Sequence, residues 1–519
     1  MKRMPRLSLL AALWLALALP VASHAQERAG QEHREQPQQE QQRQRPSGDA
    51  QRLPPESVTR HTLELPGRTL RVTATAGSLT LTDQQGAPQA EIGFVAYVRD
   101  DADPAARPVT FAVNGGPGAS SAYLNLLAIG PWRLDLDGPA ISPSAPPVLA
   151  PNGETWLDFT DLVFIDPPGT GYSRVIGGDQ VRERFYSVQG DIEGLAAFVM
   201  RWLKEKGRLQ SPKFFVGESY GGFRGPLLAQ KLQNDQGIGF SGLVLVSPVL
   251  DFGWLDQRSG APWAQAALLP SLAASVLAKS GPVTREALRD VERYASGEYL
   301  LDLMRGPRDT EAVERVSRRV AEITGLDPAL TRRLAGRVDP RTFQREVRRR
   351  VGEVVSAYDS NVASADPEPH ANVSRFEDPV LSAMTAPLTS AILDHLTRTL
   401  NYRPEGRYNL LNENVNRSWR WGGGRNAPEN TEELKSAMAL DGALRVLVVH
   451  GFTDLVTPYY ASQLQLDQIP DLGPERRLML KVYDGGHMFY SRDASRRAFR
   501  DDARALFEKA LQARAAKRD

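Results

Sequence analysis

Residues 213–221 read Lys213-Phe-Phe-Val-Gly-Glu-Ser-Tyr-Gly221, a short apolar run followed at once by a serine between two glycines. The last five residues have the Gly-x-Ser-x-Gly form of a nucleophile elbow, a sharp strand-to-helix turn that holds its serine in a strained conformation. The apolar run suits a buried strand, and 223–233 has the composition of a helix. This context predicts Ser219 as a nucleophile; a purely structural turn is the alternative.

The segments around this turn alternate between strand-like and helix-like patterns. Alternating apolar residues at 61–65 and 70–75 predict an antiparallel entry hairpin or meander. Further strands are predicted at 92–98, 109–113, 162–166, 214–216, 243–246, 444–449 and 478–483, and helices at 191–206, 223–233, 431–439 and 494–515. Such alternation favours a mostly parallel central sheet with helices on both faces, as in the α/β-hydrolase fold.

Residues 253–424 differ in sequence pattern and composition from the segments on either side. Helical patterns at 264–279, 310–324 and 340–356 and abundant arginine predict a large, mainly helical insertion, or cap, between two core strands. The run Arg348-Arg-Arg350 could mark a nucleic-acid patch, but interspersed acidic residues and the lack of an aromatic series favour a solvated helix face. The expected core therefore consists of 56–252 and 425–519, separated by this insertion.

The first residues have the pattern of an export signal. Basic residues precede the apolar run 7–19, and small residues Ser23 and Ala25 precede the expected cleavage site, so 1–25 is predicted as a signal peptide. An uncleaved anchor is the alternative. Residues 26–55 are rich in Gln, Glu, Arg and Pro and predict a disordered linker. We expect an exported protein with no membrane span after signal cleavage.

Composition narrows the classes of function further. The chain has 519 residues, 41% of them hydrophobic, and a formal net charge of +1, so it can bury a large core but offers no global attraction to nucleic acid. It has no cysteine, which excludes thiol catalysis, disulfides and Cys-ligated metals. Export without cysteine favours a bacterial periplasmic or secreted protein.

A serine nucleophile needs a base and an orienting acid, in the chain order Ser, acid, His for this fold. The strand at 444–449 leads to Asp454, and the strand at 478–483 leads to His487, each in a glycine-containing loop. His450 is the rival base, and Asp484 is the rival acid. The histidines show no metal-ligand spacing, so no metal or other cofactor is predicted.

A glycine-rich loop, Asn114-Gly-Gly-Pro-Gly-Ala-Ser-Ser121, directly follows the strand at 109–113. Such a loop can aim backbone N–H groups at a developing oxyanion. A tight turn without a ligand is one alternative. A phosphate-binding loop is another, although the Walker lysine is absent and Pro117 removes one donor.

Together these segments resemble the serine carboxypeptidase family. The matching motifs are Asn-Gly-Gly-Pro-Gly-x-Ser-Ser at 114–121, Asp-Pro-Pro-Gly-Thr-Gly-Tyr-Ser at 166–173, Gly-Glu-Ser-Tyr-x-Gly at 217–222, Asp454 before Val-Thr-Pro, and Gly-His-Met at 486–488. They occur in the family's order and cover about 60–252 and 440–500. The resemblance implies a bacterial-type member of the family with the α/β-hydrolase fold.

The resemblance also implies roles for individual residues. It assigns the triad to Ser219, Asp454 and His487, the oxyanion hole to the N–H groups of Gly116 and Tyr220, and substrate-carboxylate binding to Asn114, the Gly115 backbone and Glu218. A glutamate beside a carboxylate requires a shared proton, hence acidic conditions or a raised pKa. The family pairs that glutamate with a second acid, whereas this chain has Ala128 at the matching position.

The leading expectation is a serine-type carboxypeptidase that removes C-terminal residues from peptides through an acyl-enzyme. An esterase or acyltransferase with the same triad is the nearest alternative, because it shares every part except carboxylate recognition. A binding or scaffold protein that retains the fold without activity is the alternative from another class. The preferred residues at the scissile bond, the pH optimum, the physiological substrate and the oligomeric state are not indicated.

Overall fold

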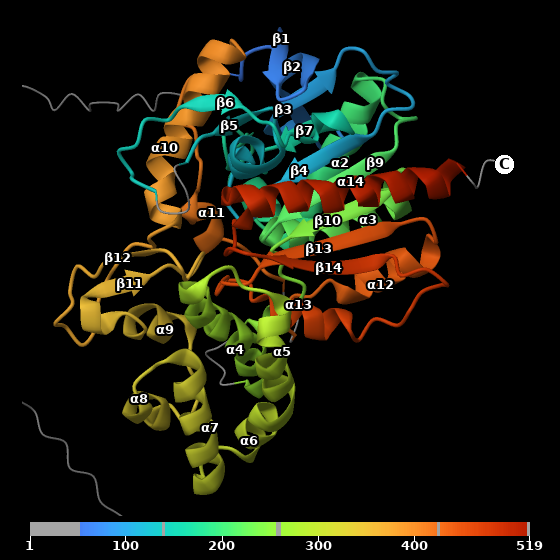
Figure 1. Ribbon diagram of the computed structural model, residues 1–519. Coiled ribbons are helices and arrows are strands. Elements are labelled where there is room, and N and C mark those ends of the chain that lie inside the picture. Colours follow the sequence, from blue (N-terminus) through green and yellow to red (C-terminus); the bar gives the residue numbers. More distant parts are fainter. Residues whose placement is uncertain (1–51, 137–140, 256–260, 423–425, 516–519) are drawn as a thin grey trace, which may run out of the picture. The chain divides into compact units, whose positions relative to one another are not determined.

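A computed structural model describes residues 52–136, 141–255, 261–422 and 426–515, and its centre is a ten-stranded sheet (Figure 1). The predicted signal peptide lies outside the described residues, as does all but the end of the predicted linker. The strands of this sheet are β1 (Ser57–Leu65), β2 (Arg68–Thr82), β3 (Pro88–Arg99), β4 (Val109–Val113), β7 (Asp161–Ile165), β8 (Arg174–Val175), β9 (Lys213–Glu218), β10 (Gly242–Val246), β13 (Arg445–Gly451) and β14 (Leu478–Tyr483).

The strand order is β1-β2-β3-β7-β4-β9-β10-β13-β14, with β8 paired to β3. β1, β2 and β3 form the predicted antiparallel meander, and β3 pairs antiparallel with β7. From β7 to β14 every pairing is parallel. The prediction of a mostly parallel sheet in an α/β-hydrolase fold is therefore confirmed.

Helices cover both faces of the sheet, as the alternating pattern predicted. Consecutive residues of β9 show why: Phe214 and Val216 face one core cluster, whereas Phe215 faces the other. The first cluster includes α14 (Asp493–Ala515) and the π-helix η1 (Leu124–Ile129). The second cluster packs under α2 (Val188–Glu205), α3 (Tyr220–Gln236) and α12 (Thr431–Leu440).

The segment between β10 and β13 packs in two places. Its first helices form a separate apolar cluster with α13 (Tyr459–Leu466), below the sheet in Figure 1. These helices are α4 (Pro262–Leu277), α5 (Arg285–Tyr294), α6 (Leu300–Arg305), α7 (Thr310–Thr324) and α9 (Pro340–Glu346), and α8 (Pro328–Arg333) packs against α7. Further along, α10 (Leu381–Asp394) joins the cluster of β1, β2 and β3. The insertion boundaries at 253 and 424 stay a prediction.

The predicted helix at 340–356 is shorter than expected. α9 ends at Glu346, and Gly352 adopts a φ of 70° that a helix cannot continue through. The next residues form β11 (Glu353–Val355), which pairs with β12 (Ala363–Ala365) because two β-branched valines suit a strand. Arg348 binds Glu353, so part of the arginine run is neutralised locally.

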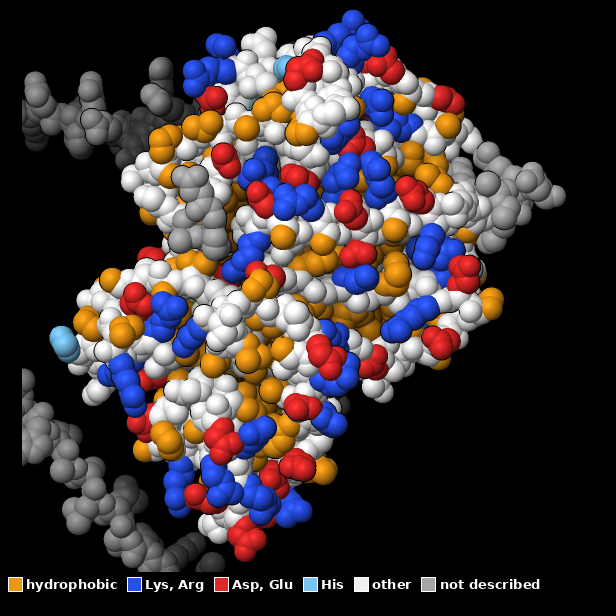
Figure 2. Space-filling view, in the orientation of Figure 1, with side chains coloured by type: hydrophobic (Ala, Val, Ile, Leu, Met, Phe, Trp, Pro, Cys, Tyr) orange, Lys and Arg blue, Asp and Glu red, His pale blue; other side chains and the backbone are white. Residues whose placement is uncertain are grey.

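The remaining elements are short. They are α1 (Asp179–Phe185), α11 (Glu413–Arg417) and the β5–β6 pair (Trp132–Leu134 and Leu149–Pro151). Figure 2 shows basic and acidic side chains interspersed over the visible face, in keeping with the small net charge. Every helix within the described ranges is too short or too polar to span a bilayer.

Candidate active site

Ser219 occupies a strained turn between β9 and α3. Its backbone has φ 60° and ψ −121°, a left-handed region that non-glycine residues rarely adopt. The turn is so tight that a Cβ on Gly217 would lie 2.0 Å from the carbonyl oxygen of Gly221. The Ser219 N–H donates to the carbonyl of Val246 at the end of β10, at 2.8 Å. The geometry is that of the predicted elbow.

The structure brings the predicted acid and base together. Asp454 follows β13 and His487 follows β14, and the Asp454 Oδ2 to His487 Nδ1 distance is 2.7 Å. Asp454 Oδ1 accepts hydrogen bonds from the N–H groups of Val456 and Thr457, at 2.8 and 3.0 Å. The Thr457 hydroxyl donates to Asp454 Oδ2 at 2.7 Å and lies 3.1 Å from His487 Nδ1. A carboxylate in this position can hold a hydrogen on Nδ1 and leave Nε2 free to accept a proton.

The charge on His487 is set by its neighbours. Burial lowers the pKa of this imidazole, but the negative charge and hydrogen bond of Asp454 and the charge of Glu218 outweigh burial. The pKa of His487 is thus raised. This environment therefore stabilises the imidazole when it receives a proton.

Neither predicted rival has a side-chain hydrogen bond or ion pair with Asp454 or His487 within the described residues. His450 is buried with Nε2 2.9 Å from the Ser462 hydroxyl, and burial lowers its pKa to about 4. Asp484 lies 3.4 Å from the Arg492 guanidinium. Both residues thus have structural partners of their own.

The glycine-rich loop after β4 lies against the elbow. A Cβ on Gly115 would lie 2.6 Å from the Tyr220 nitrogen, so only glycine permits this approach. In the described ranges the N–H groups of Gly116 and Tyr220 meet no backbone acceptor. Two unpaired donors beside a nucleophile are what an oxyanion hole requires.

Asp166 fastens this loop to the end of β7. Its Oδ1 accepts a hydrogen bond from the Ser121 N–H at 2.8 Å, and the Ser121 hydroxyl donates to the carbonyl of Ile165. Burial raises the pKa of Asp166 to about 6, against the lowering effect of the hydrogen bonds from the Ser121 N–H and the Tyr408 hydroxyl. Asp166 of the Asp-Pro-Pro-Gly motif therefore helps to hold the glycine-rich loop in position.

Asn114 and Glu218 form a buried pair beside Ser219. The Leu124 N–H donates to Asn114 Oδ1 at 2.9 Å, which turns Asn114 Nδ2 toward Glu218 Oε2, also at 2.9 Å. The Tyr490 hydroxyl donates to the same Oε2 at 2.8 Å. Burial raises the pKa of Glu218 to about 7, although His487 and both hydrogen bonds lower it. The carboxyl can therefore be protonated near neutral pH.

Arg224 is a site residue that the sequence reasoning missed. It forms a fully buried ion pair with Asp191 at 2.6 Å, donates to the Asn114 carbonyl at 2.6 Å, and lies over the Tyr220 ring at 4.6 Å from its centroid. The signal that could have found it is a charged residue on the otherwise apolar, buried start of α3.

The insertion reaches the catalytic loops. The His487 N–H donates to the Tyr358 carbonyl at 2.6 Å, and the Tyr358 ring packs edge-on against the imidazole at 5.3 Å. Asp359 accepts a hydrogen bond from Thr453 at 2.8 Å and binds Arg492 at 2.9 Å. The turn at 356–362 therefore contacts the loops of both the acid and the base.

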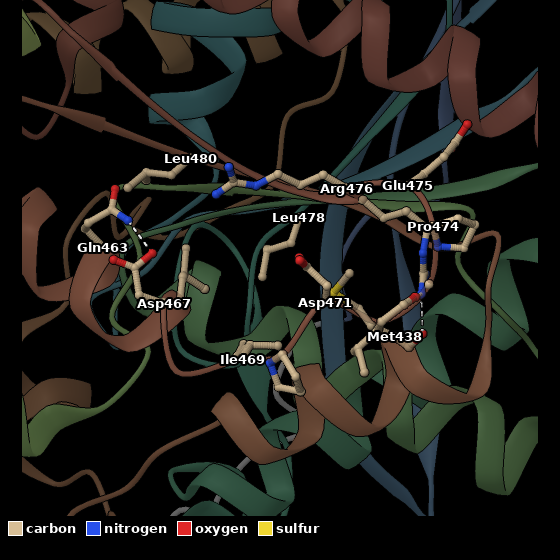
Figure 3. Close-up of a pocket in the computed structure, with 15 residues that line it drawn as sticks. Met438, Gln463, Asp467, Ile469, Asp471, Pro474, Glu475, Arg476, Leu478 and Leu480 are labelled. Atoms are coloured by element: carbon tan, nitrogen blue, oxygen red, sulfur yellow. Dashed lines mark hydrogen bonds between the residues drawn. The ribbon is translucent and has the colours of Figure 1, made fainter.

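A separate pocket lies at the edge of the sheet (Figure 3). It has a volume of about 580 Å³ and lies between α12, α13 and the loop that enters β14, with Met438, Gln463 and Leu478 on its walls. None of the predicted site residues lines it. The catalytic arrangement therefore does not depend on this pocket.

Comparison with known proteins finds similarity to serine carboxypeptidases. The sequence pattern of the serine carboxypeptidase family matches residues 67–271, which include the elbow and the glycine-rich loop but not Asp454 or His487. The chain is 26% identical over 234 residues to serine carboxypeptidase-like 5 of Arabidopsis thaliana, covering 43% of this chain and 47% of that protein. It is 30% identical over 155 residues to pheromone-processing carboxypeptidase KEX1 of Yarrowia lipolytica, covering 30% and 23%.

The matches span about half the length of the first of these relatives, and the relatives are eukaryotic. The crystal structure of the prohormone-processing carboxypeptidase Kex1(delta)p from Saccharomyces cerevisiae is similar in fold, with a TM-score of 0.53 and 14% identity. That similarity covers 86% of this chain and 92% of the other. The shared fold extends well beyond the region of sequence similarity.

Proposed function

We propose that this chain is a serine-type carboxypeptidase, which releases C-terminal residues from peptides through an acyl-enzyme intermediate. The observation that carries the proposal is the buried Asn114–Glu218 pair next to the strained Ser219, with Asp454 and His487 in hydrogen-bond contact. The match of residues 67–271 to the serine carboxypeptidase family supports it.

In the proposed reaction, Ser219 Oγ adds to the scissile carbonyl carbon while His487 Nε2 takes the hydroxyl proton. Asp454 stabilises the resulting imidazolium, and the N–H groups of Gly116 and Tyr220 bind the oxyanion. His487 then gives the proton to the leaving amine, and the C–N bond breaks. Water repeats the sequence on the acyl-enzyme, which releases the shortened peptide and restores Ser219.

Substrate selection is assigned to the carboxyl end of the peptide. The Asn114 amide, the Gly115 backbone and protonated Glu218 would each donate a hydrogen bond to the substrate's free carboxylate. Because burial raises the pKa of Glu218 to about 7, the required proton is available without strongly acidic conditions. This assignment is what separates a carboxypeptidase from other serine hydrolases.

The test compares a blocked dipeptide that has a free C-terminus with its C-terminal amide. We expect kcat/KM for the free acid to exceed that for the amide at least about tenfold, the effect of one hydrogen bond to a charged group. Equal turnover of both substrates would favour the esterase or acyltransferase alternative, which the alanine at position 128 allows. Labelling by a fluorophosphonate, lost on Ser219→Ala, tests the nucleophile, and no labelling would favour an inactive scaffold.

We also propose that the protein is exported from a bacterial cell. The signal-like pattern of residues 1–25 and the absence of cysteine support this proposal. Expression of the full chain in a Gram-negative host, followed by fractionation and N-terminal sequencing, should find a mature form that begins near Gln26. Retention of Met1 in the cytoplasmic fraction would contradict export.

A further inference from the structure

Two buried phenols that the family resemblance did not suggest belong to segments that contact Glu218 or Asn114. Tyr490 and Tyr123 are 0% and 3% exposed, and each belongs to a different element from Glu218. Tyr490 lies in the short 3-10 helix Phe489–Ser491, three residues after His487, and Tyr123 directly precedes η1. Glu218 ends β9.

Tyr490 fixes which oxygen of Glu218 can carry a proton. Both described hydrogen bonds to this carboxyl, from Asn114 Nδ2 and from the Tyr490 hydroxyl, end on Oε2. An oxygen that accepts two hydrogen bonds is the carbonyl-like oxygen of a protonated acid. The proton therefore resides on Oε1, which is free to donate it to a ligand.

Tyr490 itself is held firmly. Its carbonyl accepts a hydrogen bond from Arg496 at 2.9 Å, and its ring packs edge-on against Phe489 at 5.8 Å. A phenol fixed at both backbone and ring loses little further entropy when it orients Glu218. Such a residue is suited to positioning.

Tyr123 supplies an unused polar group in the same place. Its hydroxyl is buried and has no hydrogen-bond partner within the described ranges. The next residue, Leu124, donates its N–H to Asn114 Oδ1, and Asn114 Nδ2 donates to Glu218 Oε2, so Tyr123 belongs to the segment that contacts the Asn114–Glu218 pair. A buried hydroxyl without a partner is unfavourable unless a ligand completes it.

We propose that Tyr490 and Tyr123 take the place of a second acid in the site for the substrate's C-terminal carboxylate. Tyr490 positions Glu218 so that Oε1 donates to the carboxylate, and Tyr123 donates its own hydroxyl to it. This inference rests on the proposed carboxypeptidase function. It explains how Glu218 works with an alanine at position 128.

The two phenols have a consequence for pH dependence. Burial raises the pKa of both phenols, so both remain donors throughout the working range. The groups that face Glu218 are His487, Asp454, Tyr490, Tyr123 and Tyr358. Of the carboxylate-binding groups, only Glu218 must then be protonated for the substrate to bind. A pair of acids would have to share protons between themselves and the substrate.

The experiment measures kcat and KM against pH for the free-acid dipeptide and its C-terminal amide. Tyr490→Phe removes a donor that stabilises ionised Glu218, so the midpoint of the alkaline limb for the free acid should move up by about one pH unit. The amide should show no such shift. Tyr123→Phe should raise KM for the free acid about tenfold or more and leave kcat unchanged.

Two matched variants remove buried phenols elsewhere. Tyr299→Phe removes a hydroxyl that donates to the Gly336 carbonyl, and Tyr402→Phe removes a buried hydroxyl in the segment after α10. Both should behave as the wild type on both substrates. The rate of fluorophosphonate labelling of Ser219 reports whether each variant retains a working triad.

The outcomes separate the two levels of the proposal. If the wild type prefers the free acid but Tyr490→Phe and Tyr123→Phe have wild-type profiles, the role of the phenols is refuted and the carboxypeptidase function stands. Equal effects on acid and amide would indicate a structural role and also refute the inference. A wild type that turns over both substrates equally would refute the proposed function itself.

Discussion

Glu218→Gln tests the site most directly, because it preserves shape and removes ionisation. The amide oxygen of glutamine can accept the hydrogen bonds of Asn114 and Tyr490, as Oε2 of Glu218 does. Its NH₂ group can donate to a substrate carboxylate, as the protonated acid would. The variant therefore mimics protonated Glu218 at every pH.

The expected size of the effect follows from the pKa of Glu218, which burial raises to about 7. Above that value the protonated fraction of Glu218 falls about tenfold per pH unit, and kcat/KM of the wild type on the free acid falls with it. Glu218→Gln lacks this limb. The ratio of variant to wild-type kcat/KM should therefore grow about tenfold per pH unit above about pH 7.

The acid limb should stay where it is. The negative charge of Glu218 is one of the causes that raise the pKa of His487, but the active wild type has Glu218 protonated and therefore uncharged. On the acid side His487 thus has the same charged neighbours in the wild type and in Glu218→Gln. The variant should be active over a wider pH range on the alkaline side only.

The assay is steady-state hydrolysis of the free-acid dipeptide from about pH 5 to about pH 9, a range that covers both limbs. Glu91→Gln, at a buried glutamate bound to Arg174 far from Ser219 in the sheet order, is the matched control. If the alkaline limb of Glu218→Gln coincided with that of the wild type, ionisation of Glu218 would not control substrate binding and the reasoning would be wrong.

Three further substitutions test the supporting contacts. Asp454→Asn should lower kcat about ten-thousandfold, because an amide favours the wrong tautomer of His487. Single-turnover kinetics measures this loss, and a loss of less than about tenfold would contradict the role of Asp454 in orienting His487. Thr457→Val removes the hydroxyl bound to Asp454 and should lower kcat about tenfold with little change in melting temperature. Arg224→Met leaves Asp191 buried and unpaired, so it should lower the free energy of unfolding, measured in urea, by about 3–5 kcal/mol. The double variant that also carries Asp191→Leu should recover most of this lost stability.

The parts of the site that follow from local pattern were predictable. Nine residues at 213–221 carry the strand, the glycines and the serine, so the elbow could be identified without knowledge of its distant partners. Asp454 and His487 follow strands parallel to β9, and the carboxyl ends of parallel strands gather at one edge of a sheet. Chain order and strand pattern therefore led to both residues.

The partners of Glu218 were not predictable in this way. Tyr490 is 272 positions from Glu218 in the chain, and its contact depends on how the 3-10 helix after β14 packs on η1. Arg224 lies close to the elbow, but its role depends on Asp191 in another helix. A pattern indicates that a polar residue is buried, but packing decides which polar group it meets.

The insertion shows the same limit at a larger scale. The helical periodicity of this segment predicted which helix faces are apolar. It did not predict what those faces cover, because periodicity gives the direction in which a side chain points and not the residue that it meets. In the structure the turn at 356–362 accepts the His487 N–H through Tyr358 and binds Thr453 through Asp359. The segment predicted as a helical cap therefore contacts the loops of both His487 and Asp454, so the positions of these two residues depend on this segment as well as on the predicted core.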